Sequence, residues 1–172
     1  TLILDADVRK PNMHRLFNIE RSPGLTNILA ESTPIESVIK KTTFENLWVL
    51  TAGSKTPNPL ELMGSLEMSS LVKELMLKFE KVIIDTPPSL MISDALVLSK
   101  ISDATIFIAK SGGVSKEALI KMKEKFTSGN ARILGAILNF FEVKKHSYYY
   151  KYRYYHKYYK NYYASNEGRI QA

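Results

Sequence analysis

The 172-residue sequence predicts an α/β fold, with a mostly parallel, doubly wound sheet that has helices on both faces. Short, continuous apolar runs alternate along the chain with segments whose apolar residues repeat at helical spacing. Continuous apolar runs are typical of strands buried on both faces, as in parallel sheets. Hydrophobic residues make up 45% of the chain and charged residues 24%, which suits one globular domain with a packed core.

The apolar runs predict five strands, at residues 2–4, 46–51, 81–84, 104–109 and 132–138. Helices are predicted at residues 24–30, 35–41 and 59–78, from Ser93 or Asp94 onward, and around 118–126. The third helix has the clearest start, because Asn58 can cap it and Pro59 suits the first helical position. Asp94 is expected to act as a helix cap.

Several classes of site and segment are excluded by composition. The chain has no cysteine, which excludes disulfides, cysteine zinc sites and a cysteine nucleophile. No apolar run approaches the roughly 18 residues of a membrane span. The first residues lack the basic region of a signal peptide. The chain has no initiator Met and opens inside a predicted strand, so we expect it to be a fragment.

Charge and tyrosine content divide the chain into two parts, residues 1–143 and residues 144–172. The first part has 17 Lys and Arg against 16 Asp and Glu, whereas the second has seven against one. All ten tyrosines lie in the second part: Tyr148, Tyr149, Tyr150, Tyr152, Tyr154, Tyr155, Tyr158, Tyr159, Tyr162 and Tyr163. Because the tyrosine-rich run lacks aliphatic residues, residues 144–172 are expected to form an exposed, disordered tail. Its tyrosines could stack on nucleic-acid bases, accept phosphate, or have no specific role.

Polar residues follow three of the predicted strands. Asp5 and Asp7 come after the first, Asp85 after the third and Asn139 after the fifth. In open parallel sheets, ligands bind at the carboxyl ends of the strands, and Mg²⁺ is often held there by one or two carboxylates plus phosphates. Taken singly, these residues are commonly turn formers or caps, and Arg9 alone is commonly a surface ion-pair residue. Together, and in this order, they favour a phosphate site.

The sequence has no Gly-x-x-x-x-Gly-Lys-Ser/Thr motif. Gly112-Gly113 is not followed by Lys-Ser/Thr at the required spacing. The backbone amides and the lysine that such a loop presents to phosphates therefore have no counterpart in these 172 residues.

The combination resembles the bacterial tyrosine kinases of the capsule and exopolysaccharide type, which are P-loop NTPase-like proteins related to ATPases that position division sites. The resemblance rests on Leu-Ile-Leu-Asp-Ala-Asp-Val-Arg-Lys-Pro at 2–11, Gly-Leu at 24–25, Thr-Pro-Asn-Pro-Leu-Glu-Leu at 56–62, Val-Ile-Ile-Asp-Thr-Pro-Pro at 82–88, Ser-Asp-Ala at 93–95, Leu-Gly-Ala-Ile-Leu-Asn at 134–139, and the tyrosine cluster. The chain departs from the family by lacking the Walker A loop, so it resembles the C-terminal part of the catalytic domain.

The resemblance implies roles for individual residues. Asp5, Asp7 and Arg9 match the Walker A′ element, whose carboxylates help to hold Mg²⁺ and to activate the tyrosine hydroxyl. Asp85 matches the Walker B aspartate, which with Asp7 gives the expected metal ligands. Asn139 matches a position that contacts adenine, and the ten tail tyrosines match the autophosphorylation cluster. The implied cofactors are ATP and Mg²⁺.

The implied function is that of an ATP-dependent tyrosine autokinase that phosphorylates the tails of neighbouring subunits in a ring and regulates capsule or exopolysaccharide synthesis and export. The implied partners are a transmembrane activator of the chain-length-determinant type, separate or fused, and a tyrosine phosphatase. The implied location is the cytoplasmic face of the plasma membrane. The chain alone is expected to be inactive because the Walker A loop is absent. The alternatives are a non-kinase P-loop ATPase, a catalytically dead relative, or a nucleic-acid-binding module acting through the basic tail, although no nucleic-acid partner is expected.

Overall fold

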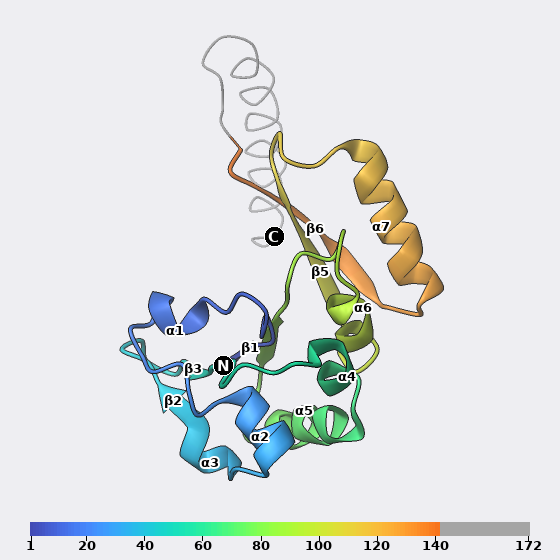
Figure 1. The fold of residues 1–172 in the computed structure, drawn as a ribbon. Coiled ribbons are helices and arrows are strands. Elements are labelled where there is room, and N and C mark those ends of the chain that lie inside the picture. Colours follow the sequence, from blue (N-terminus) through green and yellow to red (C-terminus); the bar gives the residue numbers. More distant parts are fainter. Residues whose placement is uncertain (142–172) are drawn as a thin grey trace, which may run out of the picture. The chain divides into compact units, whose positions relative to one another are not determined.

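A computed structural model describes residues 1–141 of the chain (Figure 1). The predicted disorder of residues 144–172 and all ten tyrosines fall outside these described residues. The chain divides into two units. The first contains residues 1–107 and 115–135, and the second contains residues 108–114 and the segment from 136 onward.

The central sheet of the first unit has four strands in the order β2-β3-β1-β4. Their bounds are β1 (Leu2–Asp5), β2 (Ile39–Lys41), β3 (Trp48–Leu50) and β4 (Val82–Asp85). The strand β1 pairs in parallel with both β3 and β4, whereas β2 pairs antiparallel with β3. The predicted mostly parallel sheet is thus confirmed, and three predicted strands match β1, β3 and β4.

The edge strand β2 lies where the sequence predicts the end of a helix. The predicted helix at 35–41 stops early, because α3 spans only Ile35–Val38 and Ile39–Lys41 continues as β2. Ile39 is opposite Leu50 and Lys41 is opposite Trp48, so backbone pairing with β3 replaces helical hydrogen bonds. The helical prediction for residues 39–41 is therefore wrong, because pairing with a distant strand outweighs local propensity.

The remaining helices are α1 (Met13–Leu16), α2 (Leu25–Glu31), α4 (Pro59–Met63), α5 (Leu66–Lys78), α6 (Asp94–Ser99) and α7 (Lys116–Ser128). The single helix predicted at 59–78 is divided into α4 and α5. Gly64 ends α4, and the Ser65 side chain then accepts a hydrogen bond from the Met68 N–H, which caps a new helix. A serine cap inside an apolar helical pattern thus starts a second helix that the apolar spacing alone does not reveal.

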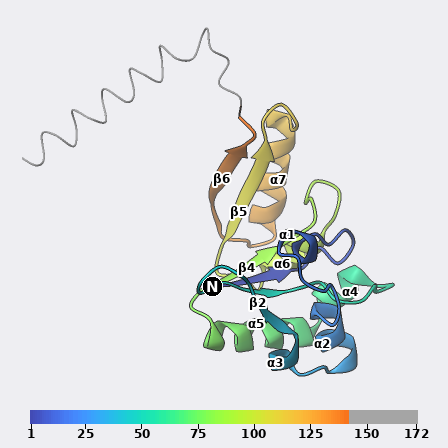
Figure 2. The same cartoon turned by 90° about the vertical axis from the view of Figure 1, so that its left-hand side faces the viewer.

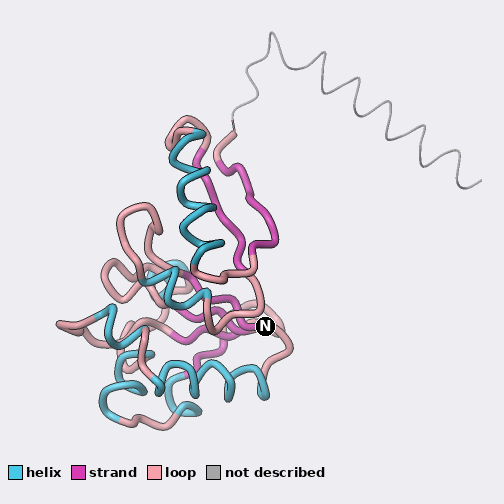
Figure 3. The backbone as a smooth tube through the Cα atoms, turned by 90° about the vertical axis from the view of Figure 1, so that its right-hand side faces the viewer, coloured by secondary structure: helices cyan, strands magenta, loops and turns pink. Residues whose placement is uncertain are grey.

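The main core lies between the central sheet and α5. Figures 2 and 3 both show α5 running along one face of that sheet. Leu2 and Leu4 of β1 pack in one cluster with Leu71 and Leu75 of α5, and all four are almost fully buried. The alternate residues point to the opposite face, where Ile83 of β4 is 55% exposed. The face covered by α5 therefore provides most of the buried apolar surface.

The strands β5 (Thr105–Lys110) and β6 (Ile133–Asn139) form a separate two-stranded sheet. Backbone hydrogen bonds run from Thr105 to Arg132 and from Ser111 to Asn139, which advance together along both segments, as in a parallel pair. In the first unit, the Phe126 ring of α7 meets Phe107 edge to face at a centroid distance of 5.0 Å. The predicted strands 104–109 and 132–138 and the predicted helix around 118–126 are thus confirmed.

Within residues 1–141, none of the helices combines the length and the apolar character needed to cross a membrane.

Two glycines allow the turn before α2 to pack against the segment after β3. A Cβ atom on Gly24 would lie 2.3 Å from the Thr51 carbonyl oxygen and 2.6 Å from the Gly53 backbone nitrogen. Gly53 has a φ of 84°, which few other residues adopt without strain. Asn27 completes the contact, because its Oδ1 accepts hydrogen bonds from the N–H groups of Gly24 and Ser54. This turn and this segment are therefore in direct backbone contact.

We predict that Gly24→Ala lowers the free energy of unfolding by roughly 2 kcal/mol, because backbone atoms surround the new methyl group and cannot rotate away. The measurement is a urea titration followed by circular dichroism. Gly135→Ala is the matched control, since nothing lies within 4 Å of a Cβ atom there. Equal stability of the two variants would show that the turn can open without loss.

Candidate functional site

Two carboxylates lie side by side at the carboxyl edge of the central sheet. The pairing of β1 with β4 places Asp5 directly opposite Asp85. The Ala6 N–H donates to the Asp85 carbonyl oxygen at 2.8 Å, so hydrogen bonding continues one residue beyond β1. The sequence-based expectation that Asp5 and Asp85 share one edge of the sheet is therefore confirmed.

Asp5 is fully buried. Its Oδ2 accepts a hydrogen bond from the Met13 N–H at 3.2 Å. Its Oδ1 is also buried and has no hydrogen-bond partner among the described residues. Burial, with a smaller contribution from the Asp7 charge, raises the pKa of Asp5 above its ordinary value. Burying a carboxylate oxygen without a hydrogen-bond partner costs free energy of folding. Unsatisfied buried groups of this kind are found at functional sites.

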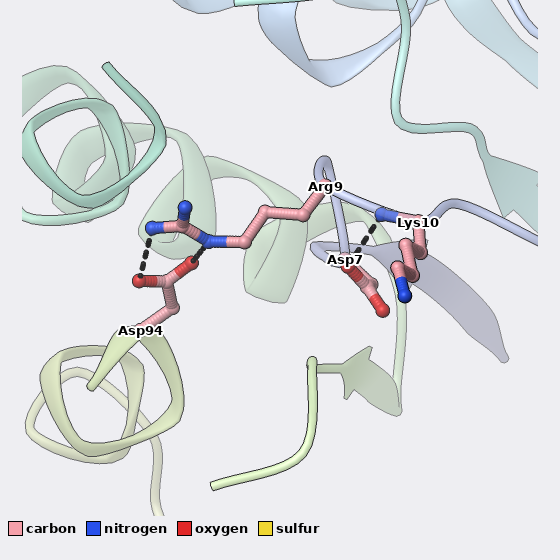
Figure 4. A network of polar contacts seen from close by, with 4 residues as sticks. All are labelled: Asp7, Arg9, Lys10 and Asp94. Atoms are coloured by element: carbon pink, nitrogen blue, oxygen red, sulfur yellow. Dashed lines mark hydrogen bonds and ion pairs between the residues drawn. The ribbon is translucent and has the colours of Figure 1, made fainter. Parts of the chain in front are cut away.

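Asp7 lies two residues beyond β1, at the start of a tight turn. Its Oδ1 accepts a hydrogen bond from the Lys10 N–H at 2.9 Å, as Figure 4 shows. The negative charge of Asp7 acts on both Asp5 and Asp85. Asp7 therefore belongs to the same electrostatic cluster as the two paired carboxylates.

The carboxyl group of Asp85 has a strongly raised pKa. Burial and, to a smaller extent, the charges of Asp5 and Asp7 together raise its pKa to about 6. Perturbed carboxyl groups of this kind are frequent at catalytic and metal-binding sites. The cluster Asp5–Asp7–Asp85 is therefore the strongest candidate site in residues 1–141.

The cluster fits a magnesium ion by its chemistry. Mutual repulsion and the unpartnered Oδ1 of Asp5 are both relieved by a cation. Within residues 1–141, no three His, Asp or Glu side chains converge as a ready-made metal-binding group. Mg²⁺ commonly needs no such group, because it keeps several waters and takes one or two carboxylates plus substrate phosphates.

Arg9, predicted as a catalytic residue, is engaged with Asp94. Its Nε donates to Asp94 Oδ2 at 2.9 Å and its Nη2 donates to Oδ1 at 3.2 Å. Figure 4 shows the guanidinium extended toward Asp94 and away from Asp7. The Asp94 side chain is 1% exposed, against 37% for Arg9. Arg9 is thus held by a bidentate ion pair in this structure, and its catalytic role stays a prediction.

The prediction that Asp94 caps a helix is wrong. Ser93 occupies the cap position of α6, and Asp94 is the first helical residue. The Asp94 carboxylate bonds to Arg9, which is 85 positions away in the sequence. An Asp after a Ser at a helix start looks like a cap, and no local signal reveals its distant partner. Sequence reasoning therefore missed Asp94 as part of this region.

Asn139 lies at the carboxyl end of β6, in the second unit. Its Oδ1 accepts a hydrogen bond from the Phe140 N–H at 2.9 Å. Its backbone oxygen accepts another from the Ser111 N–H at 2.8 Å. The predicted position at the carboxyl end of a strand is thus confirmed, whereas its contact with adenine stays a prediction. The ten tyrosines predicted to be phosphorylated lie outside the described residues.

No family model matches the sequence. The chain is 38% identical over 148 residues to the tyrosine-protein kinase YwqD of Bacillus subtilis, a match that covers 86% of this chain and 62% of YwqD. The chain therefore spans less than two thirds of that relative's length.

Solved structures agree with this likeness. The kinase domain of VpsO superposes with a TM-score of 0.78 at 33% identity, with 82% of this chain and 70% of that domain covered. The septum site-determining protein MinD of Pyrococcus horikoshii, solved with Mg-ADP, superposes with a TM-score of 0.66 at 22% identity, covering 84% of this chain and 59% of MinD. The MinD likeness concerns the fold alone, which is that of P-loop NTPases. On the sequence identity and the coverage of the VpsO kinase domain, the chain belongs to the family of bacterial tyrosine kinases.

Proposed function

We propose that this chain contributes the Walker A′ and Walker B carboxylates of an ATP-dependent protein tyrosine autokinase. The observation that carries the proposal is the cluster Asp5–Asp7–Asp85 at the paired ends of β1 and β4. In the proposed arrangement, residues 1–143 form part of the kinase domain and residues 144–172 form the substrate tail. The family membership supports the same assignment.

The three carboxylates suit phosphoryl transfer to a phenol. That reaction asks mainly for positioning and charge neutralisation, since the transferred group needs little covalent help. Asp7 and Asp85 would hold Mg²⁺, which neutralises charge on the ATP phosphates. A tyrosine hydroxyl has a reference pKa of about 10, so a neighbouring carboxylate assists the removal of its proton. Asp5 and Asp7 are the candidates for that role.

The tail provides the proposed acceptor groups. Residues 144–172 hold the ten tyrosines, Tyr148 to Tyr163, together with seven Lys and Arg, so phosphates placed there meet a basic segment. In a ring of subunits, each tail reaches its neighbour's site at a high effective concentration. Asn139 is the proposed contact for adenine, and the ring is the proposed oligomer.

The proposed setting is the cytoplasmic face of the plasma membrane, in capsule or exopolysaccharide synthesis and export. A transmembrane activator, separate or fused, would recruit and stimulate the kinase, and a tyrosine phosphatase would reset it. We also infer that residues 1–172 alone bind ATP weakly, since they have no Gly-x-x-x-x-Gly-Lys motif to hold the phosphates.

We predict that the full-length protein, incubated with ATP and Mg²⁺, gains mass in steps of about 80 Da, one for each phosphate added. Intact-mass spectrometry measures the steps, and peptide mapping places them on residues 144–172. Asp7→Asn is expected to abolish them, because it removes a proposed metal ligand and candidate base.

Asp103→Asn is the matched control, since it makes the same change at an exposed carboxylate before β5. It should leave the mass steps unchanged. ATP hydrolysis without any mass increase would point instead to a non-kinase ATPase of the same fold, and neither activity would point to a dead relative.

We predict that Asp85→Asn stabilises the metal-free protein at neutral pH. The pKa of Asp85 is about 6 in the folded state, above its ordinary 3.8, so the folded protein binds this proton more tightly than the unfolded chain. Stability should therefore fall as the pH rises between those two values, and the variant should lose that part of the fall. Urea titrations in chelator at about pH 4.5 and about pH 7.5 measure the difference.

Asp103→Asn again provides the comparison, because an exposed carboxylate should not alter this pH dependence. If Asp85→Asn and wild type lost equal stability between the two pH values, Asp85 would not be a destabilising charge in the metal-free site.

A further inference from the structure

The pair Arg9–Asp94 connects the two segments that leave the candidate site. Arg9 lies on the segment that follows β1, two residues after Asp7. Asp94 begins α6, at the end of the segment that follows β4 and Asp85. The ion pair therefore links the two segments at residues that follow the aspartates in the sequence. The pairing of β1 with β4 links the same two parts of the chain at Asp5 and Asp85. The site lies within a closed loop of covalent and noncovalent links.

Asp94 is a rigid anchor for this link. Its carboxylate is 1% exposed, and α6 buries Ala95 and Leu98 beside it. Leu98 belongs to the main core cluster and Ala95 to the cluster around Phe126, so α6 is packed from two sides. A side chain at the start of a helix that is packed in this way has little freedom to shift.

The geometry of the pair favours orientation over simple charge pairing. The guanidinium presents two N–H groups to two carboxylate oxygens, at 2.9 Å and 3.2 Å. A bidentate pair of this kind sets the direction of the arginine as well as its distance. A buried carboxylate that loses its partner is strongly unfavourable, so the pair persists once it has formed.

Arg9 belongs to the turn that contains Asp7, so fixing the position of Arg9 also restrains this turn. The Lys10 N–H, next in sequence to Arg9, donates to Asp7 Oδ1, and the Met13 N–H donates to Asp5 Oδ2. Movement of the Arg9 backbone would thus disturb the hydrogen bonds that orient two of the three carboxylates. Figure 4 shows Asp7, Arg9, Lys10 and Asp94 in this arrangement.

We propose that Asp94 is a positioning residue for the carboxylate site: through its two hydrogen bonds to Arg9 it holds the turn after β1, and hence Asp7, in the geometry needed to bind a divalent cation. This inference deepens the proposed function and rests on it for its catalytic consequence. Its binding consequence concerns the carboxylates alone.

The first test measures Mn²⁺ binding to the full-length protein by electron paramagnetic resonance, with the metal alone as probe. Asp94→Asn keeps the size of the side chain but removes its charge, and Arg9→Lys keeps the charge but removes the bidentate contact. Each variant is expected to weaken Mn²⁺ binding about tenfold, as is common when a group that orients a metal ligand is lost. The exchange Arg9→Asp with Asp94→Arg should recover part of the affinity.

Glu36→Gln is the matched control. It removes another long-range ion pair, between Lys78 and Glu36, which is exposed and involves none of the three carboxylates. Its Mn²⁺ affinity should equal that of wild type. Thermal melts accompany every variant, and binding is compared well below the lowest melting temperature, so that a loss of stability alone leaves the affinity unchanged.

The second test measures phosphoryl transfer with ATP. For Asp94→Asn, kcat is expected to fall about 10- to 100-fold while KM for ATP changes by less than about threefold, because misplaced carboxylates impair the transfer more than the binding of ATP.

Absence of transfer in wild type would contradict the proposed function, and the Mn²⁺ comparison would still decide the role of Asp94. Wild-type Mn²⁺ affinity in both Arg9→Lys and Asp94→Asn would overturn this inference. If Asp94→Asn failed to fold, Arg9→Lys would decide alone.

Discussion

The parallel, in-register pairing of β1 with β4 is the constraint on which the rest of the site depends. It places Asp5 opposite Asp85 at the edge where both strands end. The α5 helix covers the sheet on one face, so these ends adjoin a core that excludes water. Burial at this edge is the main cause of the raised pKa values of both aspartates, and the charges of neighbouring aspartates add to it. The fold alone thus raises the pKa values of these aspartates, without a bound ligand.

The arrangement of the aspartates costs free energy of folding, which a region with a structural role alone would not require. Asp5 is buried with one carboxylate oxygen unpartnered among the described residues, and Asp85 lies close enough to Asp5 and Asp7 to be disfavoured as an anion. Other buried polar side chains have partners: Asn27 Oδ1 accepts from two backbone N–H groups, and Asp94 accepts from the Nε and Nη2 groups of Arg9. The unpartnered oxygen of Asp5 and the raised pKa of Asp85 support the proposal that these aspartates bind a cation.

Sequence patterns predict a helix or strand correctly where the residues of that element alone determine its structure. The strands predicted at residues 2–4 and 81–84 are confirmed as β1 and β4. Each could be predicted because its apolar run is short and continuous and is followed by an aspartate. The strand at residues 39–41 is not predictable from its own composition, because it depends on pairing with β3. The break between α4 and α5 was also hidden, because Ser65 becomes a cap only when its side chain turns back to Met68.

The sequence by itself determined the class of fold, the kinase resemblance and the positions of Asp5, Asp7 and Asp85 after strands, because apolar periodicity and residue type are properties of short segments. The tertiary structure decided which of these residues lie together. It set Asp5 against Asp85 through strand register, and it joined Arg9 to Asp94 across 85 positions of the sequence. Register and long-range ion pairs depend on how separate elements pack, and no pattern within a single segment encodes that packing.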